Sequence, residues 1–462
     1  MILKYPQYIQ RMFVALEKED IAPVYLVGGY VRNGILDLPP GDLDLSGSIA
    51  PQRFSQLKNK EIRDLKRVYG LGTIVLQQKF AGENYTYEYT AFRKDNYGRG
   101  GAHRPQSVVF TEDITEDALR RDFTINALYA DAAGTVLDPT GRGICAIEGK
   151  KIEQVTTETL SQDALRILRM VRFACELGFS VEKTTYACAK RYVPQLADIS
   201  AERIRDEFVK ILLADAKYGN KDAVLRGLHM LHDLGAFPYI FPRLCDGDGV
   251  KQNPKYHAHD VMEHALRTCA CAPPDIETRL AALLHDIGKP RALERFGKMA
   301  GHNTLGQEIA AEELQNLRFD KITVQNVGVL IREHMFDLTN QAGKKAVIRV
   351  ITRLGEQQFL KLCDLREADF CGSCMGNVAD SAVKWREMLH ALKNANAPMR
   401  LKDLAVNGND LQKELGIPAG RQIGELLSRL LAYAAKKPSQ NNYKSLIRYA
   451  KIVTAQQSAS SV

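Results

Sequence analysis

The chain has 462 residues, 45% of them hydrophobic. Domain sizes of about 100 to 200 residues then predict three or four modules and exclude a single compact domain. The 63 basic and 55 acidic residues leave a mild net charge of +8, which fits a polyanionic partner such as RNA but does not require one. No uninterrupted apolar run approaches the roughly 18 residues that span a bilayer, so we expect no membrane segment.

The first 150 residues mix strand and helix patterns, whereas the rest of the chain is helical. Alternating residues in "PVYLVGG", "GTIVLQQKF" and "YTYEYTAF" predict strands. Later segments such as "ETRLAALLHDIGK" place apolar residues at helical spacing. We therefore predict an α+β fold, with a small mixed sheet followed by helices. The expected domains are a head over 1–150, a neck over 151–245, a third domain over 250–380 and a tail over 381–462.

Two aspartates stand one residue apart in "GDLDL". In a strand, residues two apart point to the same side at about 6 to 7 Å, so the carboxylates of Asp42 and Asp44 can converge. Converging carboxylates bind divalent cations, and two Mg²⁺ ions roughly 3.5 to 4 Å apart can activate a hydroxyl and neutralise a leaving pyrophosphate. The alternative for such a strand is a solvated face without a metal.

The metal hypothesis is strengthened by four further residues, Gly28, Gly29, Arg32 and Glu88. Gly28 and Gly29 leave backbone N–H groups bare at the start of a predicted helix, where a triphosphate can bind, and Arg32 adds positive charge one turn inside. In "NYTYEYTAFR", strict alternation separates Glu88 from the tyrosines on the other strand face. Glu88 is therefore a candidate third metal ligand, with an exposed strand glutamate as the alternative.

The motifs "GGYVRNGILDLPPGDLDL", "EYTAFR" and "RRDFTINAL" together resemble the head of class II tRNA nucleotidyltransferases (CCA-adding enzymes) and bacterial poly(A) polymerases. This family has a polymerase-β-like nucleotidyltransferase head. The resemblance implies that Asp42 and Asp44 are catalytic and bind two Mg²⁺ ions, with Glu88 assisting. Asn33 departs from the usual aspartate, and we expect it to weaken a supporting contact but not the reaction. The resemblance also implies that the nucleotide is bound by Gly28, Gly29, Arg32, Arg121, Asp122 and Asn126.

The segment "SQDALRILRMVRFACELGF" places four polar residues at steps of three along one predicted helix. Aspartate only accepts and arginine only donates hydrogen bonds, so fixed side by side they can select a base without a nucleic-acid template. The alternative is an ordinary amphipathic helix with an ion pair. The segment resembles the family's nucleotide-selecting motif EDxxR, with Gln162 in place of the first acid. The implied nucleotide-binding residues are Asp163, Arg166, Arg169 and Arg172.

Histidines and aspartates form a second pattern between residues 256 and 370. "YHAHDVMEHAL" and "RLAALLHDIGKP" resemble an HD domain, a helical phosphohydrolase fold in which such side chains bind a divalent transition metal. His302 and His334 fall where a second metal or a phosphate would bind, although Met335 stands where related domains often have aspartate. The alternatives are structural histidines or a scaffold with little turnover. The implied ligands are His264, His285, Asp286 and Asp369.

Two basic segments complete the resemblance. "RKDNYGRGGAHRP" (93–105) is predicted to be a flexible loop, and in this family a loop at that point helps to switch from C to A addition. The C-terminal region resembles the part of the family that holds the tRNA elbow. Its cations can contact a phosphate backbone without reading sequence, or can simply form solvated helix faces. They are Lys402, Arg421, Arg429, Lys436, Lys437 and Lys444.

Together these motifs imply a template-independent, Mg²⁺-dependent enzyme that adds CMP and AMP from CTP and ATP to the 3′ end of tRNA. A-only addition, poly(A) polymerase activity, an HD phosphohydrolase acting on nucleotides or RNA ends, and an RNA-binding protein with inactive sites are the alternatives. Nine cysteines, mostly in apolar helical segments, predict reduced buried thiols and a cytoplasmic protein. The oligomeric state is left open.

Overall fold

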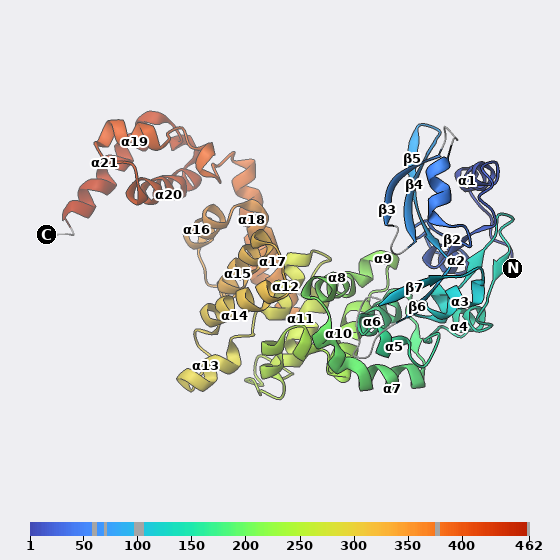
Figure 1. Ribbon diagram of the computed structural model, residues 1–462. Coiled ribbons are helices and arrows are strands. Elements are labelled where there is room, and N and C mark those ends of the chain that lie inside the picture. Colours follow the sequence, from blue (N-terminus) through green and yellow to red (C-terminus); the bar gives the residue numbers. More distant parts are fainter. Residues whose placement is uncertain (58–61, 69–71, 97–105, 375–378, 460–462) are drawn as a thin grey trace. The chain divides into compact units, whose positions relative to one another are not determined.

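The structure, a computed structural model, describes residues 1–57, 62–68, 72–96, 106–374 and 379–459. The chain forms two compact units, Met1–Phe241 and Pro242–Val462 (Figure 1). The first contains the sheet and the second is helical, which confirms the predicted α+β fold with a helical body. The four-domain division stays a prediction.

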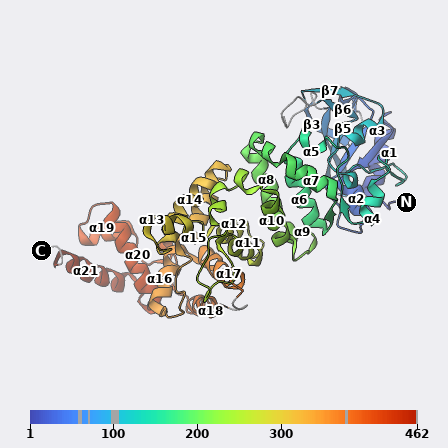
Figure 2. The same ribbon diagram turned by 90° about the horizontal axis from the view of Figure 1, so that it is seen from below.

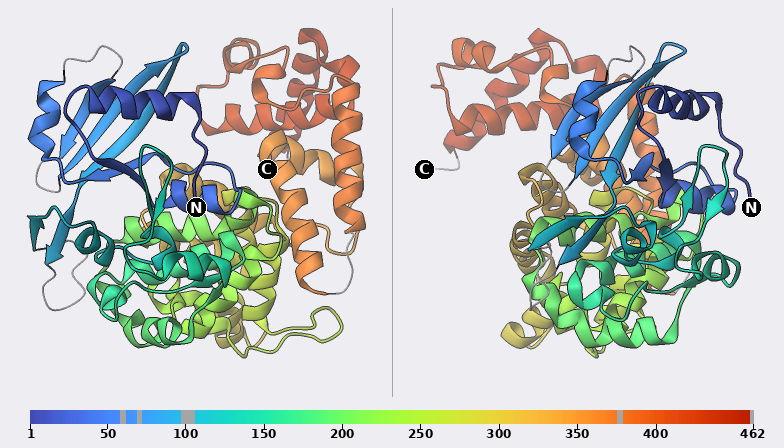
Figure 3. Two further views of the ribbon diagram at one scale, coloured as in Figure 1. Left: turned by 90° about the vertical axis from the view of Figure 1, so that its right-hand side faces the viewer. Right: turned by 45° about the vertical axis from the view of Figure 1, so that its right-hand side comes forward.

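The first unit is built on a seven-stranded sheet in the order β3-β4-β5-β2-β1-β8-β9. β2 and β5 run parallel, and the other neighbouring pairs are antiparallel. Helix α1 (Gln7–Glu17) lies along the sheet (Figure 3), where Tyr8 stacks on Tyr85 with ring centroids 4.1 Å apart. The strands are β1 (Val24–Val27), β2 (Asp44–Gly47), β3 (Ile62–Val68), β4 (Thr73–Phe80), β5 (Glu83–Ala91), β8 (Tyr129–Ala130) and β9 (Val136–Leu137).

Strand β5 shows the predicted alternation. Tyr87 and Tyr89 are buried, whereas Glu88 between them is exposed. In the parallel register of β2 with β5, Glu88 is the direct partner of Asp44. Neighbouring strands lie about 4.8 Å apart, so the register brings together two acids that are 44 residues apart in the sequence.

Further short elements surround the sheet and join it to the neck. Helix α6, whose residues are nearly all buried, packs against α8, α9 and α10 (Figure 2). The helices are α2 (Gly29–Ile35), α3 (Ile114–Leu119), α4 (Gly143–Glu148), α5 (Thr159–Gln162), α6 (Leu165–Leu177), α7 (Lys183–Tyr192), α8 (Ala201–Leu212), α9 (Ala214–Tyr218) and α10 (Ala223–Leu234). The 3₁₀ turns are Pro51–Gln56, Thr124–Asn126, Val193–Asp198 and Phe237–Tyr239. There are also two two-stranded sheets. One pairs β6 (Arg93–Asn96) with β7 (Ser107–Phe110), and the other pairs β10 (Lys151–Ile152) with β11 (Ser180–Val181).

The second unit contains α-helices and 3₁₀ turns. Helices α11, α12, α15 and α17 pack on one another, and α19, α20 and α21 share a separate apolar cluster. The helices are α11 (Val261–Cys271), α12 (Ile276–Leu284), α13 (Lys289–Phe296), α14 (His302–Asn316), α15 (Lys321–Glu333), α16 (Lys344–Leu354), α17 (Glu356–Gly372), α18 (Asp380–Asn394), α19 (Gly408–Leu415), α20 (Arg421–Lys436) and α21 (Tyr443–Ala459). The 3₁₀ turns are Pro242–Gly247, Leu401–Asp403 and Pro438–Gln440.

The cysteines correct one prediction. Cys271 at the end of α11 and Cys371 near the end of α17 form a disulfide, and Cys145 and Cys374 are exposed. Buried reduced thiols were therefore the wrong prediction for these four. The packing of α11 on α17 joins Cys271 and Cys371, which are 100 residues apart.

Among the described helices, none is long and apolar enough to cross a membrane. Most of the predicted basic loop, residues 97–105, lies outside the described residues.

Candidate active site and candidate metal centre

A cavity of about 760 Å³ lies in the first unit, between the start of α2, the segment before β2 and the helices of the neck. Nine arginines and lysines but only four aspartates line it, so its positive charge suits a polyanion such as a triphosphate. Every residue predicted for the head and neck site lines the cavity except Glu88. They are Gly28, Gly29, Arg32, Asp42, Asp44, Arg121, Asp122, Asn126, Asp163, Arg166, Arg169 and Arg172.

The glycine pair connects β1 to α2 at the edge of this cavity. Gly28 has φ +73° and ψ −128°, a conformation that is open to glycine but strained for other residues. Its N–H donates to the Leu128 carbonyl at 3.2 Å. A Cβ at Gly28 would lie 4.0 Å from the Asp44 carboxylate, so the turn passes directly beside the acids. Gly29 then begins α2.

The three predicted metal ligands come together around the start of β2. β2 begins at Asp44, so Asp42 lies in the loop before it, and the prediction that both stand in one strand was wrong. Burial, followed by repulsion from Glu88 and Asp42, raises the pKa of Asp44 to about 6. A divalent cation would relieve this repulsion, so the donor set fits the predicted Mg²⁺.

Hydrogen bonds link Arg32 to the "RRD" motif. Arg32 is 3% exposed, and its Nη1 donates to Asn126 Oδ1 at 2.6 Å. Asn126 Nδ2 donates to Asp122 Oδ1 at 3.0 Å, and Arg169 donates to Asp122 Oδ2 from Nε at 2.8 Å and Nη2 at 2.6 Å. Burial by itself would raise the pKa of Asp122, but Arg169, Asn126 and Arg166 hold it well below its usual range. Asp122 is therefore ionised and oriented before a nucleotide arrives.

Asp117, on α3, fixes Arg121 and was missed by the sequence analysis. It is 0% exposed and accepts hydrogen bonds from Arg120 Nε at 2.8 Å, Arg121 Nη2 at 3.0 Å and the Tyr129 hydroxyl at 2.6 Å. Burial opposes ionisation of Asp117, yet Arg121 and Arg120 lower its pKa overall. The spacing of an acid three and four residues before two arginines was the available signal.

The four residues predicted to select the base do not all lie on one continuous helix. Asp163 follows α5 with extended backbone and precedes α6, so the prediction that it shares a helix with the three arginines was wrong. Its Oδ2 accepts from Arg203 Nη2 of α8 at 2.9 Å. Arg166 donates to the carbonyl oxygens of Thr159 at 3.1 Å and Arg120 at 2.7 Å. Asp163 and Arg166 nevertheless line the same cavity, so both are available to a base.

Four polar cavity residues from the neck were also missed. Arg203 and Lys210 belong to "ISAERIRDEFVKILLA", whose basic residues were the available signal. Lys217 pairs with the buried Glu176 at 3.0 Å. Tyr218 ends α9, and no motif pointed to it.

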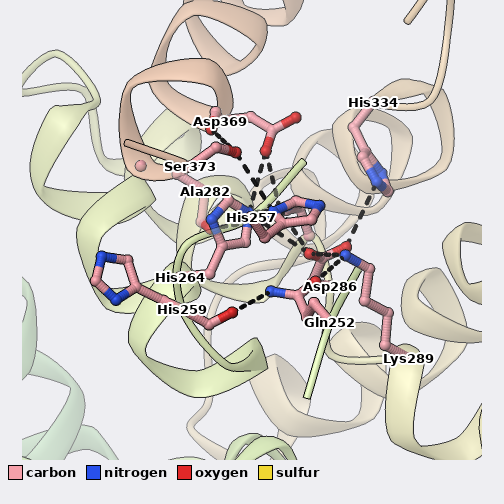
Figure 4. Close-up of polar contacts among 12 residues, drawn as sticks. Gln252, His257, His259, His264, Ala282, Asp286, Lys289, His334, Asp369 and Ser373 are labelled. Atoms are coloured by element: carbon pink, nitrogen blue, oxygen red, sulfur yellow. Dashed lines mark hydrogen bonds and ion pairs between the residues drawn. The ribbon is translucent and has the colours of Figure 1, made fainter. Parts of the chain in front are cut away.

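The second unit holds six buried histidines and aspartates in two groups (Figure 4). Asp286 joins the groups, because its Oδ2 lies 3.2 Å from His285 Nε2 and its Oδ1 lies 3.1 Å from His302 Nε2. The four predicted ligands therefore lie together, and the two additional histidines extend the cluster. One group is His264, His285 and Asp369, and the other is Asp286, His302 and His334.

Backbone carbonyls orient three of these imidazoles. The Nδ1 atoms of His285, His302 and His334 lie 2.8, 2.8 and 2.6 Å from carbonyl oxygens, which can only accept, so each Nδ1 carries a proton. In the neutral ring, Nε2 then presents a bare lone pair. His302 Nε2 and His334 Nε2 face each other at 3.1 Å, and a cation between them would relieve the repulsion. The donor set therefore fits a divalent transition metal.

Polar groups that the sequence analysis missed border the cluster. Lys289 Nζ lies 2.5 Å from Asp286 Oδ2 and 2.6 Å from Gln252 Oε1 (Figure 4). The His257 ring packs edge-on against His264, with centroids 4.6 Å apart. The lysine in "HDIGKP" was a signal, because a cation beside a metal site can bind phosphate.

Three family profiles match the chain in order. They are the poly A polymerase head domain over residues 24–153, the probable RNA and SrmB-binding site of polymerase A over 178–247, and the HD domain over 255–370. The structure is similar to that of the Bacillus stearothermophilus CCA-adding enzyme in complex with CTP, with 25% identity and a TM-score of 0.72 over 99% of this chain and 100% of that one. The fold also matches the Thermotoga maritima CCA-adding enzyme complexed with tRNA, with 16% identity and a TM-score of 0.56 over 96% of this chain and 94% of that one.

Sequence relatives agree with the profiles. The chain is 28% identical over 432 residues to the CCA-adding enzyme of Enterococcus faecalis, which covers 92% of this chain and 91% of the relative. It is 37% identical over 430 residues to that of Limosilactobacillus fermentum, which covers 92% of both. Since this second match spans nearly the whole of both proteins, the chain belongs to the CCA-adding enzyme family.

Proposed function

We propose that this chain is a template-independent tRNA nucleotidyltransferase that adds CMP and AMP to the 3′ end of tRNA and releases pyrophosphate. The observation that carries the proposal is the cavity of the first unit, in which the acids at the start of β2 face arginines from the head and neck. Similarity along the full length to CCA-adding enzymes supports the same function.

The residues around the cavity have distinct roles in this proposal. Asp42 and Asp44, with Glu88 assisting, would hold Mg²⁺, which supplies activation of the attacking hydroxyl and charge neutralisation. Arg32 and the backbone of Gly29 bind the triphosphate so that the tRNA 3′-hydroxyl attacks the α-phosphate in line.

The base is selected by the neck. Asp163 supplies acceptors and Arg166 supplies donors, while Arg121 and Asp122 contact the nucleotide and its ribose. Arg169 and Arg172 hold this side of the cavity in place, because Arg169 pairs with Asp122 at 2.6 Å and Arg172 pairs with Glu207 at 3.0 Å. Selection by fixed side chains needs no template strand.

Extension of a tRNA transcript that lacks its CCA end, with each nucleotide supplied separately, tests this function. We expect CTP alone to add two residues, ATP to add one residue after them, and UTP and GTP to add none at comparable rates, because Asp163 and Arg166 select the base. Products are resolved on a sequencing gel.

Different extension patterns would contradict the proposal. Addition only to a transcript that already ends in CC identifies an A-adding enzyme, and long A tails on any RNA identify a poly(A) polymerase. No extension under any condition, from a chain that still binds tRNA, refutes nucleotidyl transfer altogether.

The C-terminal cations fit a role in holding the body of the tRNA. All six predicted residues are exposed: Lys402, Arg421, Arg429, Lys436, Lys437 and Lys444. Backbone contacts of this kind release counterions, so tRNA affinity should fall as salt rises. Cytoplasmic location stays a prediction.

A second activity is favoured by the shared aspartate in the second unit. Asp286 bridges two groups of buried donors, and Lys289 lies beside it. We propose that this site binds a divalent transition metal and hydrolyses phosphate esters of nucleotides or RNA ends, since a bound metal supplies an activated water and Lys289 can bind the phosphate.

Metal content and phosphate release test the second activity in the full-length chain. An Asp44→Ala background removes nucleotidyl transfer. We expect His302→Ala to lower the bound transition metal, measured by elemental analysis, and to lower phosphate release by roughly 100-fold, because a ligand to the metal is lost. His390→Ala, which changes an exposed histidine on α18, should alter neither.

The metal measurement separates two negative outcomes. Metal that stays bound without any phosphate release identifies a structural metal and contradicts hydrolysis. Equal metal content in His302→Ala and in the unaltered chain contradicts the site itself.

A further inference from the structure

The side chain of Asn33, on α2, forms four hydrogen bonds that join three parts of the active site. It is 1% exposed. Its Oδ1 accepts from Arg32 Nε at 3.1 Å and from Arg32 Nη2 at 2.9 Å. Its Nδ2 donates to the Pro39 carbonyl at 2.7 Å and to the Tyr218 hydroxyl at 2.9 Å. The amide thus uses both lone pairs and both protons, which is its full capacity.

Each partner of Asn33 has its own place in the site. Arg32 lines the cavity as the candidate triphosphate residue. Pro39 begins the short segment that leads through Gly41 to Asp42. That segment packs closely against the start of α2, because a Cβ at Gly41 would lie 3.2 Å from the backbone of Gly29.

Tyr218 brings the neck into the same network. It ends α9, lines the cavity and accepts from the Asn33 amide although it lies 185 residues further along the chain. The amide therefore contacts the arginine, the segment before the acids and the neck at once.

Only an amide can make this combination of contacts. Aspartate, which the family usually has at this position, has the same shape but can only accept when it is ionised. One of its oxygens could still bind Arg32. Its other oxygen would face the Pro39 oxygen at about the observed 2.7 Å with no proton between them, and the two would repel. The Tyr218 hydroxyl, by contrast, could turn and donate.

We propose that Asn33 is a positioning residue that sets the placement of the Asp42 segment relative to the triphosphate-binding Arg32. This inference rests on the proposed nucleotidyl transfer. It goes beyond the expectation that Asn33 only weakens a supporting contact. Because Asn33 is neutral, it also orients Arg32 without cancelling its charge, and that charge remains available to the triphosphate.

The test measures kcat and KM for CTP and ATP with the full-length chain and a tRNA transcript lacking its CCA end. For Asn33→Asp we expect kcat/KM to fall roughly 10- to 100-fold, since a small misplacement of reacting groups costs about that much. KM should rise because an ion pair weakens the hold of Arg32 on the triphosphate, and kcat should fall because the Asp42 segment moves. Asn84→Asp, with the same charge change on an exposed residue of β5, is the matched control and should be kinetically unchanged.

Tyr218→Phe removes the hydroxyl that accepts from Asn33 and also interacts with Arg32, and it keeps the ring, so it tests the neck contact of the network separately. We expect a smaller decrease in kcat with an unchanged melting temperature. If Asn33→Asp does not fold, this variant decides the question: a decrease in kcat at an unchanged melting temperature supports the inference, and unchanged kinetics overturn it. A folded Asn33→Asp chain with the kcat and KM of the unaltered protein also overturns it.

The split between kcat and KM separates positioning from a loss of folded enzyme. A partly unfolded preparation lowers kcat alone, with KM unchanged, and that result for Asn33→Asp would overturn a positioning role. If the unaltered chain does not extend tRNA, the proposed function fails. If it does and Asn33→Asp extends equally well, only the present inference fails.

Discussion

Asp44→Asn is expected to abolish nucleotide addition and, at the same time, to make the folded chain more stable above pH 6. The carboxylate is replaced by an amide of the same shape that binds Mg²⁺ poorly, so incorporation of CMP and AMP should fall roughly 1,000-fold or more. Transfer activity is measured by extension of truncated tRNA, and tRNA affinity, measured by filter binding, should stay the same.

The stability gain follows from the raised pKa of Asp44. Its pKa is about 6 in the folded chain against an ordinary 3.8, so above pH 6 the folded state carries a charge that is disfavoured by roughly 2 to 3 kcal/mol. Asparagine removes that cost. Below about pH 4 both folded and unfolded chains hold the proton, and the difference should disappear. Urea unfolding without Mg²⁺ at several pH values measures this.

Asp20→Asn is the matched control for both readouts. Asp20 is 89% exposed, and its positive φ of 56° suits asparagine as well as aspartate, so neither activity nor stability should change. Asp44→Asn with more than a tenth of normal activity would refute the metal role. Lower stability at pH 8 would show that Asp44 supports the fold.

Asp117→Ala is expected to destabilise the first unit by about 3 to 5 kcal/mol. The buried carboxylate accepts from Arg120, Arg121 and the Tyr129 hydroxyl, and its loss leaves two mostly buried arginine charges without this partner. The chain has one tryptophan, Trp385, and it lies on α18 in the second unit. Urea unfolding followed by far-ultraviolet circular dichroism should therefore show an earlier first transition, while Trp385 fluorescence should not shift.

The pH dependence of this effect has the opposite sign to that of Asp44. Because the pKa of Asp117 is lowered by its arginines, its stabilising contribution is present above the unfolded pKa and is lost as pH falls through the folded pKa. The loss caused by Asp117→Ala should therefore shrink in acid. Glu116→Ala on the same helix, with a side chain 39% exposed, should change stability by less than about 0.5 kcal/mol. An equal effect of both substitutions would contradict the argument.

Local sequence patterns by themselves determined the chemistry of both candidate sites. Alternation in β5 placed Glu88 opposite the buried Tyr87 and Tyr89, because side chains in a strand point to alternate faces. The glycine pair predicted bare backbone at the start of a helix, and α2 begins there at Gly29, directly after Gly28. The His285–Asp286 pair and its resemblance to an HD domain predicted a group of possible metal ligands, and these side chains do lie together.

Only the tertiary structure decided which of these groups contact one another. Asp163 accepts from Arg203 of α8, 40 residues further along the chain, a partner that the spacing of three did not predict. Asn33 reaches Tyr218 across 185 residues of sequence. A hydrogen bond depends on distance and direction to within a few tenths of an ångström, and these are set by how separate helices and strands pack. Residue type and spacing specify what a side chain can donate or accept, but the packing of distant elements selects its partner.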